Sequence, residues 1–504
     1  MVAHVLTVAP IGFEGALVEV ESDAKKGLPA IQIVGMGTKS IDEAKERVRS
    51  AIANSLLEFP ARKITINLAP AELVKDGAHF DLPIALAILV SSGQLRQSEV
   101  DDIVFAGELA LDGTLRPIKG TINIAEATRK AGINKLIVPT ANAEQACLIK
   151  GIEVVGVASL KELFLHLKRE QILPITTAAP LQHSQRRSPS QLIDDIYGQE
   201  QAKRALIIAA AGRHNILLAG PPGAGKTMLA KTLTSLLPDL TADEQIAVTK
   251  LHSIAGEIDG EVINERPFRA PHHTTSQIAI IGGGARPKPG EISLAHLGVL
   301  FLDEIPEYPR SVLEALRQPL EDKKIAVSRA GGRMLYPADF MLVATMNPCP
   351  CGYLGDPTKE CSCSQTQILT YQKRLSGPMM DRIDLVINVS RVPNDILLEA
   401  REKQNKQHNL GLNQIENARK AQTERYNSST IYNGSLGSSQ VHKLLKLHPE
   451  AKLLLNTAGE RLGLSARSYF KIIKVAQTIA DIELAPIITK THIAEALQYR
   501  RQTS

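Results

Sequence analysis

The sequence contains no tryptophan and few aromatic residues of any kind. Trp is absent from the 504 residues, and Phe, Trp and Tyr together make up 4% of them. Surfaces that bind single strands by stacking bases depend on such side chains. The scarcity argues against a base-stacking surface, so we expect any contact with nucleic acid to run mainly through lysine and arginine.

Long hydrophobic runs are also missing. No apolar run approaches the ~18 residues needed to span a bilayer, and the first ten residues lack the pattern of a signal peptide. We therefore expect a soluble, cytoplasmic protein without a membrane partner. The formal net charge of +5 gives no general argument for a polyanionic partner, but it is compatible with a local basic surface.

Cysteine is rare, and four of the five cysteines fall within one short segment. They form two Cys-x-Cys pairs around a turn rich in Gly, Pro and Asp: Cys349, Cys351, Cys361 and Cys363. In a cytosolic chain such clustering favours a metal over disulfides, and four thiolates can close a tetrahedral Zn²⁺ site. The alternative is four free thiols, which would oxidise readily at a surface. We expect zinc to brace this loop without redox work.

The length predicts two to four domains. Residues 1–168 alternate short apolar runs with helical patterns, for example at 64–68 and 82–90, which predicts a self-contained α/β domain. Residues 169–192 are rich in Pro, Thr, Ser, Gln and Arg without apolar periodicity, which predicts a linker.

The second half predicts two further domains. Within 193–392, apolar strands such as 299–302 alternate with helices, which is typical of a parallel sheet covered on both faces. A polar stretch at about 403–440 opens the last part, 393–504, and the apolar stripe at 469–482 makes this part a small α-helical domain.

A phosphate-binding motif follows an apolar strand and precedes a helix. Its residues are Gly220, Pro221, Pro222, Gly223, Ala224, Gly225, Lys226 and Thr227. The glycines allow a tight loop whose backbone N–H groups face phosphate. Lys226 would reach the β and γ oxygens of ATP, and the Thr227 hydroxyl would ligate Mg²⁺. This strand–loop–helix context favours a nucleotide site over a chance match.

The second half of a nucleotide site follows the strand at 299–302. Asp303 would hold Mg²⁺ through water, and Glu304 would polarise the attacking water. A lone Asp-Glu pair after a strand is more often a solvated strand end. Its place about 75 residues after the phosphate loop favours the catalytic interpretation.

These motifs, with 344–348 and 377–384, resemble AAA+ ATPases of the helix-2-insert clade, which includes magnesium chelatase subunits and MCM helicases. The resemblance implies that Asn347 is the sensor 1 residue. It implies that Arg382 is an arginine finger acting across a subunit interface and that Arg467 is sensor 2. Any of these arginines alone would be an ordinary surface residue. A finger supplied in trans requires a ring, and the resemblance implies a homo-hexamer.

Two segments of the first domain, 66–77 and 107–120, resemble the Lon protease domain. Lon-type enzymes use a Ser/Lys dyad. Here His79 stands where the serine is expected, and Ile122 stands where the lysine is expected. Without nucleophile and base that chemistry cannot run, so we interpret the domain as a non-proteolytic binding or assembly unit.

Residues 320–333 predict a hairpin with a Gly-Gly turn, placed before the strand that carries sensor 1. Its cations are Lys323, Lys324, Arg329 and Arg333. AAA+ helicases carry at this place a pore hairpin that tracks the phosphate backbone, so the resemblance favours DNA binding by these four residues. The residues alone fit a solvated surface hairpin equally well.

The whole chain resembles the YifB/ComM family of magnesium-chelatase-like proteins, through its domain order and through 266–274, 281–284 and 298–304. The resemblance implies an ATP-driven hexameric DNA helicase that promotes branch migration when single-stranded DNA is integrated by homologous recombination in natural transformation. Single-stranded and branched DNA would be its partners, and a recombinase filament would be a further one. The alternative is a chelatase-type ATPase remodelling a protein or metal-insertion partner. A chelatase would need a partner subunit with an integrin-like metal-binding domain, which this chain lacks.

Overall fold

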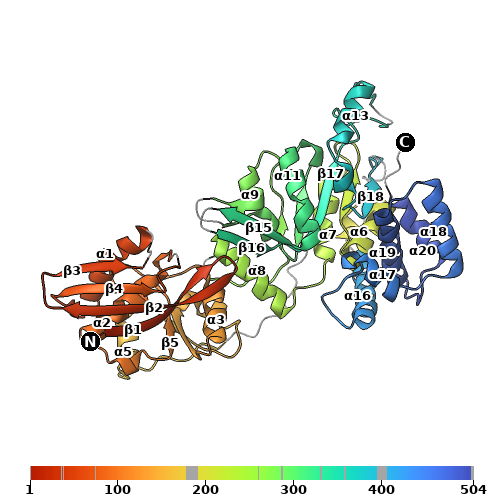
Figure 1. Ribbon diagram of the computed structural model, residues 1–504. Coiled ribbons are helices and arrows are strands. Elements are labelled where there is room, and N and C mark those ends of the chain that lie inside the picture. Colours follow the sequence, from red (N-terminus) through yellow and green to blue (C-terminus); the bar gives the residue numbers. More distant parts are fainter. Residues whose placement is uncertain are drawn as a thin grey trace.

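The computed structural model describes residues 2–500 except 36, 38, 74, 178–190, 259, 285–287, 330–331, 357–358 and 394–405. Figure 1 shows three units in chain order, with an N-terminal unit at one end and a helical unit at the other. We define the N-terminal unit as residues 2–177, the central unit as 191–393 and the helical unit as 406–500. No helix among the described residues is both long and apolar enough to cross a bilayer.

The N-terminal unit is built on a seven-stranded mixed sheet with the order β3-β4-β2-β1-β5-β8-β9. Burial alternates along β4, where Ile64, Ile66 and Leu68 face the core, as expected for a strand with one exposed side. The strands are β1 (Val2–Ile11), β2 (Glu14–Lys25), β3 (Ala30–Val34), β4 (Lys63–Ala69), β5 (Ile103–Phe105), β8 (Lys135–Pro139) and β9 (Glu153–Val157), with a separate pair β6 (Glu108–Leu109) and β7 (Leu115–Arg116).

Helices cover this sheet, and one of them lies in the core. Every residue of α2 from Asp81 to Val90 is buried, which explains why its sequence is apolar on all sides. The buried Asp81 carboxylate is paired with Arg47 of α1 at 2.7 Å. The helices are α1 (Lys39–Asn54), α2 (Asp81–Ser91), α3 (Thr121–Lys130), α4 (Thr140–Ala146) and α5 (Leu160–Leu167).

The N-terminal unit extends past the predicted boundary at 168. Leu173 is buried in its core, and the amide of Thr176 donates to the carbonyl of Val154 at 2.8 Å. The predicted linker, 169–192, is therefore still packed on the unit as far as Thr176. Its middle part lies outside the described residues.

The central unit contains a five-stranded sheet with the order β11-β14-β17-β10-β18, and all neighbours are parallel. Leu217 faces one core cluster, whereas Ile216 and Leu218 face another, so both sides of the sheet are buried as predicted. The strands are β10 (Ile216–Ala219), β11 (Phe268–Arg269), β14 (Val299–Leu302), β17 (Met341–Met346) and β18 (Leu385–Asn388).

Two small ribbons and nine α-helices of the described residues complete this unit. The predicted hairpin at 320–333 is present as the antiparallel pair β15 and β16. The ribbons are β12 (Gly282–Gly283) with β13 (Lys288–Pro289), and β15 (Lys324–Arg329) with β16 (Gly332–Pro337). The helices are α6 (Glu200–Gly212), α7 (Lys226–Leu236), α8 (Ala242–Ala255), α9 (Gln277–Ile281), α10 (Glu291–Leu294), α11 (Arg310–Ala315), α12 (Arg317–Asp322), α13 (Gln365–Lys373) and α14 (Gly377–Met380).

The helical unit differs from expectation in its first part. The stretch at 403–440 contains the 21-residue helix α16, although its sequence is polar. Five residues at helical spacing form its buried stripe: His408, Gly411, Ile415, Ala418 and Gln422. Because only Ile415 among them is strongly apolar, the stripe gives no hydrophobic signal. The helices are α16 (Lys406–Tyr426), α17 (Ser438–Leu444), α18 (Pro449–Arg461), α19 (Ala466–Ile482) and α20 (Lys490–Gln498).

The N-terminal unit packs on the central unit through α3 and α8. Lys250 of α8 is 4% exposed, pairs with Glu126 of α3 at 2.5 Å, and lies 4.1 Å from the ring centre of Phe13. Phe13 is at the tip of the β1–β2 hairpin, which reaches toward β16 in Figure 1. Gly12 at the same tip lies against the side chain of Met334.

Candidate functional site

The phosphate-binding loop lies between β10 and α7, at the carboxyl edge of the parallel sheet. Gly225 has a φ of +83° and caps α7. A side chain at Gly220 would collide with the carbonyl oxygen of Val389. Glycine is therefore required at these two positions, at one for its backbone conformation and at the other for space. Thr227 is exposed in the first turn of α7, where the N-terminal end of the helix favours an anion.

Lys226 is 8% exposed and folds back over the loop. Its Nζ donates to the carbonyls of Gly220 (2.6 Å) and Pro221 (3.0 Å) and to Oδ1 of Asn347 (3.0 Å). Burial lowers the pKa of Lys226, while the carboxylates of Asp303 and Glu304 oppose that shift. A phosphate oxygen is a stronger acceptor than these neutral groups, so the ammonium is placed to exchange them for a phosphate.

Two strand ends hold the acidic pair next to this lysine. The Oδ1 of Asn347 accepts from Lys226, and its Nδ2 donates to Oε1 of Glu304 at 3.1 Å. The hydroxyl of Thr345 accepts from the Glu304 amide at 2.9 Å and donates to Asp303. The ends of β10, β14 and β17 thus bring Lys226, Asp303, Glu304 and Asn347 into one connected group, and both carboxylates are exposed to an incoming ligand.

A cavity of about 470 Å³ adjoins the phosphate loop. Its walls come from three separate segments: 196–199 before α6, the loop at 222–225, and Arg391 and Val392 after β18. Gln199 ties these segments together, because its Nε2 donates to the carbonyls of Ala224 (2.9 Å) and Ser390 (3.2 Å). The position of the cavity beside the loop suits the base and sugar of a nucleotide.

Sequence reasoning missed this cavity. Tyr197, Gln199 and Arg391 carry no motif of the kind that identifies a phosphate loop, and they lie almost 200 residues apart at the extremes. The available signal was local. Gly198 and Gln199, both with positive φ, stand directly before the alanine-rich α6, which marks a sharp turn into a buried helix.

The two predicted catalytic arginines lie together, away from this cavity. Arg382 precedes β18, and its carbonyl accepts from the side chain of Asn215, the residue before β10. Since β10 and β18 are parallel, Arg382 is at the amino edge of the sheet, opposite the phosphate loop. Nη2 of Arg382 pairs with Glu321 at 2.8 Å, and Arg467 from the start of α19 pairs with the same carboxylate.

The predicted DNA-binding cations are distributed unevenly over the β15–β16 hairpin. Lys323 caps α12 at the base of the hairpin, and its Nζ pairs with Asp339 at 2.9 Å. Lys324 is exposed on β15. Beside the turn, Arg329 pairs with Gly332 and Arg333 pairs with Ser328 across the two strands. The side chains of these two arginines lie outside the described part of the structure. The hairpin is thus anchored at one end through Lys323 and presents the other three positions beyond that anchor.

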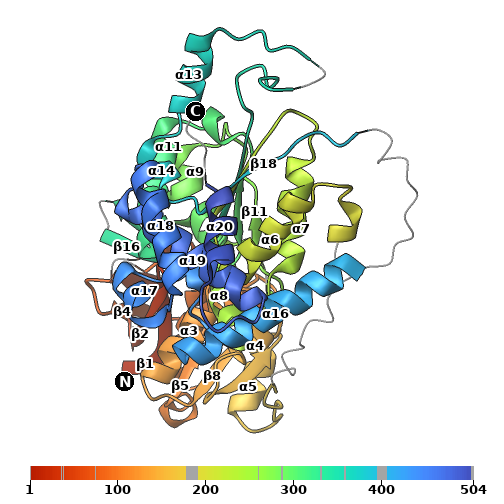
Figure 2. The same ribbon diagram turned by 90° about the vertical axis from the view of Figure 1, so that its right-hand side faces the viewer.

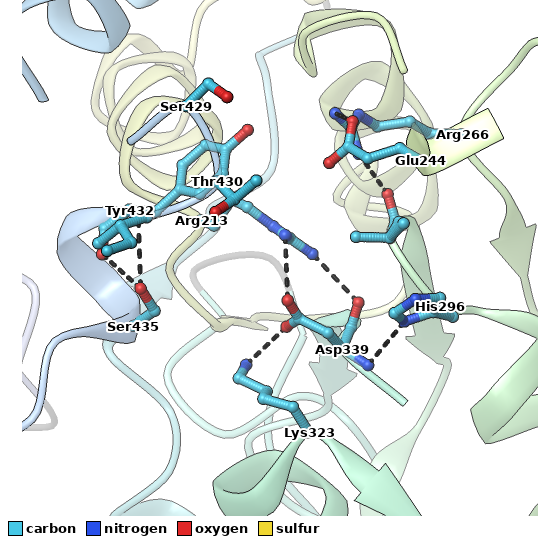
Figure 3. Close-up of polar contacts among 12 residues, drawn as sticks. Arg213, Glu244, Arg266, His296, Lys323, Asp339, Ser429, Thr430, Tyr432 and Ser435 are labelled. Atoms are coloured by element: carbon cyan, nitrogen blue, oxygen red, sulfur yellow. Dashed lines mark hydrogen bonds and ion pairs between the residues drawn. The ribbon is translucent and has the colours of Figure 1, made fainter. Parts of the chain in front are cut away.

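Asp339 is the centre of that anchor (Figure 3). Besides Lys323 it contacts Arg213 at 3.4 Å, and its amide donates to Nδ1 of His296 at 3.0 Å. Although burial opposes ionisation, the charges of Arg213 and Lys323 hold the pKa of Asp339 below its usual value. Arg213 also lies over the ring of Tyr432, so the anchor joins the hairpin base to the helical unit.

The four clustered cysteines converge in space. The Sγ of Cys349 lies 3.3 Å from that of Cys351 and 3.6 Å from that of Cys361, and all four Sγ atoms lie within 4.8 Å of one another. A tetrahedron of thiolates around Zn²⁺ at ~2.3 Å has edges of about 3.8 Å, whereas a disulfide needs about 2.05 Å. Four thiol donors at this spacing fit a structural zinc ion. Cys147, the fifth cysteine, donates to the carbonyl of Thr176 elsewhere.

The cysteine loop contacts the phosphate loop and the wall of the adjoining cavity. Gly352 packs on Pro222 so closely that an added Cβ would be 2.7 Å from its ring. Asp356, whose side chain is fully buried, pairs at 3.2 Å with Nε of Arg391, a residue of the cavity wall. The loop is followed by α13, which projects from the central unit in Figures 1 and 2. The cysteine cluster is therefore connected to the phosphate loop through Gly352 and to the cavity through Asp356.

The positions that correspond to a protease dyad are part of a core. His79 is buried, and its Nε2 contacts the carbonyl of Val8 at 3.1 Å. Burial lowers the pKa of His79 to about 4, so the imidazole is neutral at neutral pH. Ile122 is fully buried in α3. Neither side chain is available for hydrolytic chemistry.

Comparison with protein families gives matches to magnesium chelatase along most of the chain. The model described as "Magnesium chelatase, subunit ChlI" matches residues 192–397. "Subunit ChlI of Mg-chelatase" matches 20–142, and "Magnesium chelatase, subunit ChlI C-terminal" matches 412–500. The first range covers the central unit from residue 192 and continues to 397, and the other two fall in the N-terminal and helical units.

Two relatives are similar to this chain along nearly its whole length. Competence protein ComM of Haemophilus influenzae is 42% identical over 502 residues, which covers 99% of this chain and 97% of the relative. YifB of Escherichia coli is 43% identical over 501 residues, covering 98% and 96%. The magnesium-chelatase 67 kDa subunit of Chlorobaculum parvum is 27% identical over 157 residues, or 31% of this chain and 23% of the subunit.

Proposed function

The chain belongs to the YifB/ComM family of magnesium-chelatase-like AAA+ ATPases, and from this membership we propose that it is an ATP-driven hexameric DNA helicase. In this proposal it promotes branch migration while incoming single-stranded DNA is integrated by homologous recombination during natural transformation. The full-length similarity to a competence protein supports that role. Single-stranded and branched DNA would be its substrates in the cytoplasm, where it would meet a recombinase filament.

The group at the carboxyl edge of the sheet supports ATP hydrolysis. When bound, Mg²⁺ would neutralise the phosphates, with Thr227 and Asp303 as its protein-side contacts. Lys226 would move from the loop carbonyls to the β and γ oxygens. Glu304, held by Asn347 at 3.1 Å, would orient and deprotonate the attacking water.

Arg382 and Lys226 lie at opposite edges of the sheet, and this separation supports the proposal of a ring. Arg382 and Arg467 lie at the amino edge of the parallel sheet, whereas the phosphate loop lies at the carboxyl edge. Arg382 and Arg467 are therefore placed too far from this loop to contact a γ-phosphate bound by their own subunit. A second copy that packs its amino edge onto this carboxyl edge would supply both arginines, and repeating that contact closes a ring.

The hairpin provides the proposed DNA contact. Lys324, Arg329 and Arg333 would neutralise backbone phosphates in the pore, while Lys323 holds the base through Asp339. Contacts of this kind do not read sequence, which suits an enzyme that moves along any strand.

We also propose that Cys349, Cys351, Cys361 and Cys363 hold a structural zinc ion. The convergence of four Sγ atoms supports this assignment. The ion would fix the loop against Pro222 and Arg391, so its effect would be felt at the nucleotide cavity.

The test is ATP hydrolysis by the purified chain with and without single-stranded DNA, combined with branch migration of labelled forked and four-way DNA. We expect DNA to stimulate hydrolysis and ATP to drive strand exchange, both abolished in Lys226→Ala. Binding to DNA should weaken steeply as salt rises. If DNA neither binds in the presence of nucleotide nor stimulates hydrolysis, the helicase proposal is wrong.

The matches to magnesium chelatase models favour one alternative, an ATPase that remodels a metal-insertion partner. That activity would show hydrolysis independent of DNA and stimulated by a partner protein. The same assay therefore separates the two functions.

A further inference from the structure

One carboxylate holds both predicted catalytic arginines. Oε1 of Glu321, near the end of α12, accepts from Nη2 of Arg382 at 2.8 Å and from Nη2 of Arg467. The hydrogen bond from Arg467 holds the pKa of Glu321 below its usual value, and the bond from Arg382 adds a smaller effect in the same direction. Glu321 is therefore ionised at neutral pH. Two guanidinium groups from different units thus share one acceptor atom.

The two arginines are fixed to different degrees. Arg382 is 8% exposed and also donates to the carbonyls of Arg317 (3.2 Å) and Pro378 (2.6 Å). Arg467 is 43% exposed at the start of α19. An exposed arginine samples many rotamers unless a partner restricts it. Glu321 is therefore the contact that aligns the arginine of the helical unit with the rigid arginine of the central unit.

Charge explains why an acidic residue is needed here. Two guanidinium groups on one acceptor repel each other, and Lys471 of α19 adds a further positive charge next to Arg382, with its Nζ donating to the carbonyl of Ile383 at 2.5 Å. Glu321 offsets this repulsion at the shared acceptor, while Asp384 and Asp381 face Lys471. A phosphate group offers more oxygen acceptors and more charge than a carboxylate, so it would compete for the same two arginines.

We infer that Glu321 is a positioning residue that pre-aligns Arg382 and Arg467, and that the γ-phosphate of ATP on a neighbouring subunit replaces it as their common acceptor. This inference rests on the proposed ring. Glu321 does not touch the reacting atoms. It limits the rotamers of the Arg467 side chain before phosphate binds, so that less conformational entropy is lost when the arginine binds the phosphate.

The test compares Glu321→Ala with the parent in DNA-stimulated ATP hydrolysis. We expect kcat to fall about tenfold because Arg467 is no longer restrained, whereas KM for ATP and the affinity for a fluorescent nucleotide stay unchanged. Glu321→Gln keeps an acceptor oxygen and should restore part of kcat. Glu314→Gln is the matched control, because Glu314 is a carboxylate of the neighbouring α11 that pairs with Arg317. Its kcat should equal that of the parent.

A double-mutant cycle asks whether Glu321 acts through Arg467. Glu321→Ala should have no further effect on kcat in the Arg467→Ala background. Multiplicative effects, or a parent-like kcat in Glu321→Ala, would overturn the inference.

A second readout does not depend on activity. Phenylglyoxal modification of Arg467, followed by mass spectrometry, should be several-fold faster in Glu321→Ala than in the parent and unchanged in Glu314→Gln. Equal rates in all three proteins would overturn the inference. A parent that hydrolyses no ATP would instead contradict the proposed function, while the modification rates would still report on Glu321.

Discussion

At the scale of single residues, Glu304 offers the sharpest separation of binding from chemistry. Glu304→Gln keeps the oxygen that accepts from Asn347 at 3.1 Å but removes the base. We expect ATP to bind as in the parent, and kcat to fall by roughly 100-fold or more. Fluorescent-nucleotide binding and steady-state hydrolysis measure the two quantities. Turnover near that of the parent would remove Glu304 from its proposed role.

Two buried histidines predict how stability depends on pH. Burial lowers the pKa of His79 and of His296 from 6.5 to about 4. A depressed folded-state pKa means that the stabilising contribution is present above pH 6.5 and is lost as pH falls toward 4. For His79 the loss between pH 7.5 and 5 is about 2 kcal/mol.

Urea unfolding of the parent and of His79→Gln at these two pH values measures this effect. His79→Gln should be less stable than the parent at pH 7.5 but should lose less stability on acidification. His448→Gln is the control, since His448 is exposed. A pH dependence in His79→Gln equal to that of the parent would contradict the assignment.

At the scale of elements, the sequence predicted the buried strands β10, β14 and β17 and the phosphate loop but not α16. Apolar runs give a direct signal for β10, β14 and β17 because both faces of these strands are buried. The stripe of α16 is built from small and polar side chains, such as Gly411 against Ile207 and Gln422, which donates to the carbonyl of Ala211 at 3.0 Å. These residues are buried for fit and hydrogen bonding, so hydrophobic periodicity could not find them.

The same limit applies to the site. Lys226 and Glu304 lie in local motifs, which a sequence displays. Glu321, Gln199 and Arg391 act through partners far away in the chain, and only the fold brings those partners together. The sequence therefore predicts the chemical groups at the phosphate but not the residues that align them.

The cysteine loop contacts both the phosphate loop and the cavity wall. We therefore predict that metal binding at the cysteines and nucleotide binding are coupled. Cys361→Ser should lose the zinc that we expect at one ion per chain in the parent. Because Asp356 holds Arg391 at the cavity and Gly352 packs on Pro222, nucleotide affinity should fall several-fold with it. Elemental analysis and fluorescent-nucleotide titration measure the two effects.

Cys147→Ser is the matched control, because Cys147 lies in the N-terminal unit. It should keep both the zinc and the nucleotide affinity of the parent. Loss of zinc from Cys361→Ser without any change in nucleotide affinity would contradict the linkage.

At the scale of the whole molecule, the order of the three units follows from the sequence, but their contacts do not. Glu126 and Lys250 are 124 residues apart in the chain. In the sequence each is an ordinary charged residue of a helix, and only the packing of α3 on α8 brings the two together. At the tip of the β1–β2 hairpin, Gly12 lies against the side chain of Met334, and Phe13 packs on the same core cluster as Met334. Through this tip the N-terminal unit reaches the hairpin proposed to contact DNA, so its docking is the feature of the whole molecule that most needs a test.

Glu126→Ala leaves the ammonium of Lys250 buried over Phe13 without its carboxylate. Breaking a fully buried pair in this way costs about 3 kcal/mol, and because Glu126 is 25% exposed we expect a smaller loss here. Replacing both charges by apolar groups is close to neutral. We therefore expect Glu126→Ala to lower the urea midpoint and to increase the radius of gyration measured by X-ray scattering, because the N-terminal unit separates from α8. Glu126→Ala combined with Lys250→Met should restore both values toward those of the parent. If the double variant is as unstable as Glu126→Ala alone, the loss comes from elsewhere in α3 and the pair does not hold the two units together.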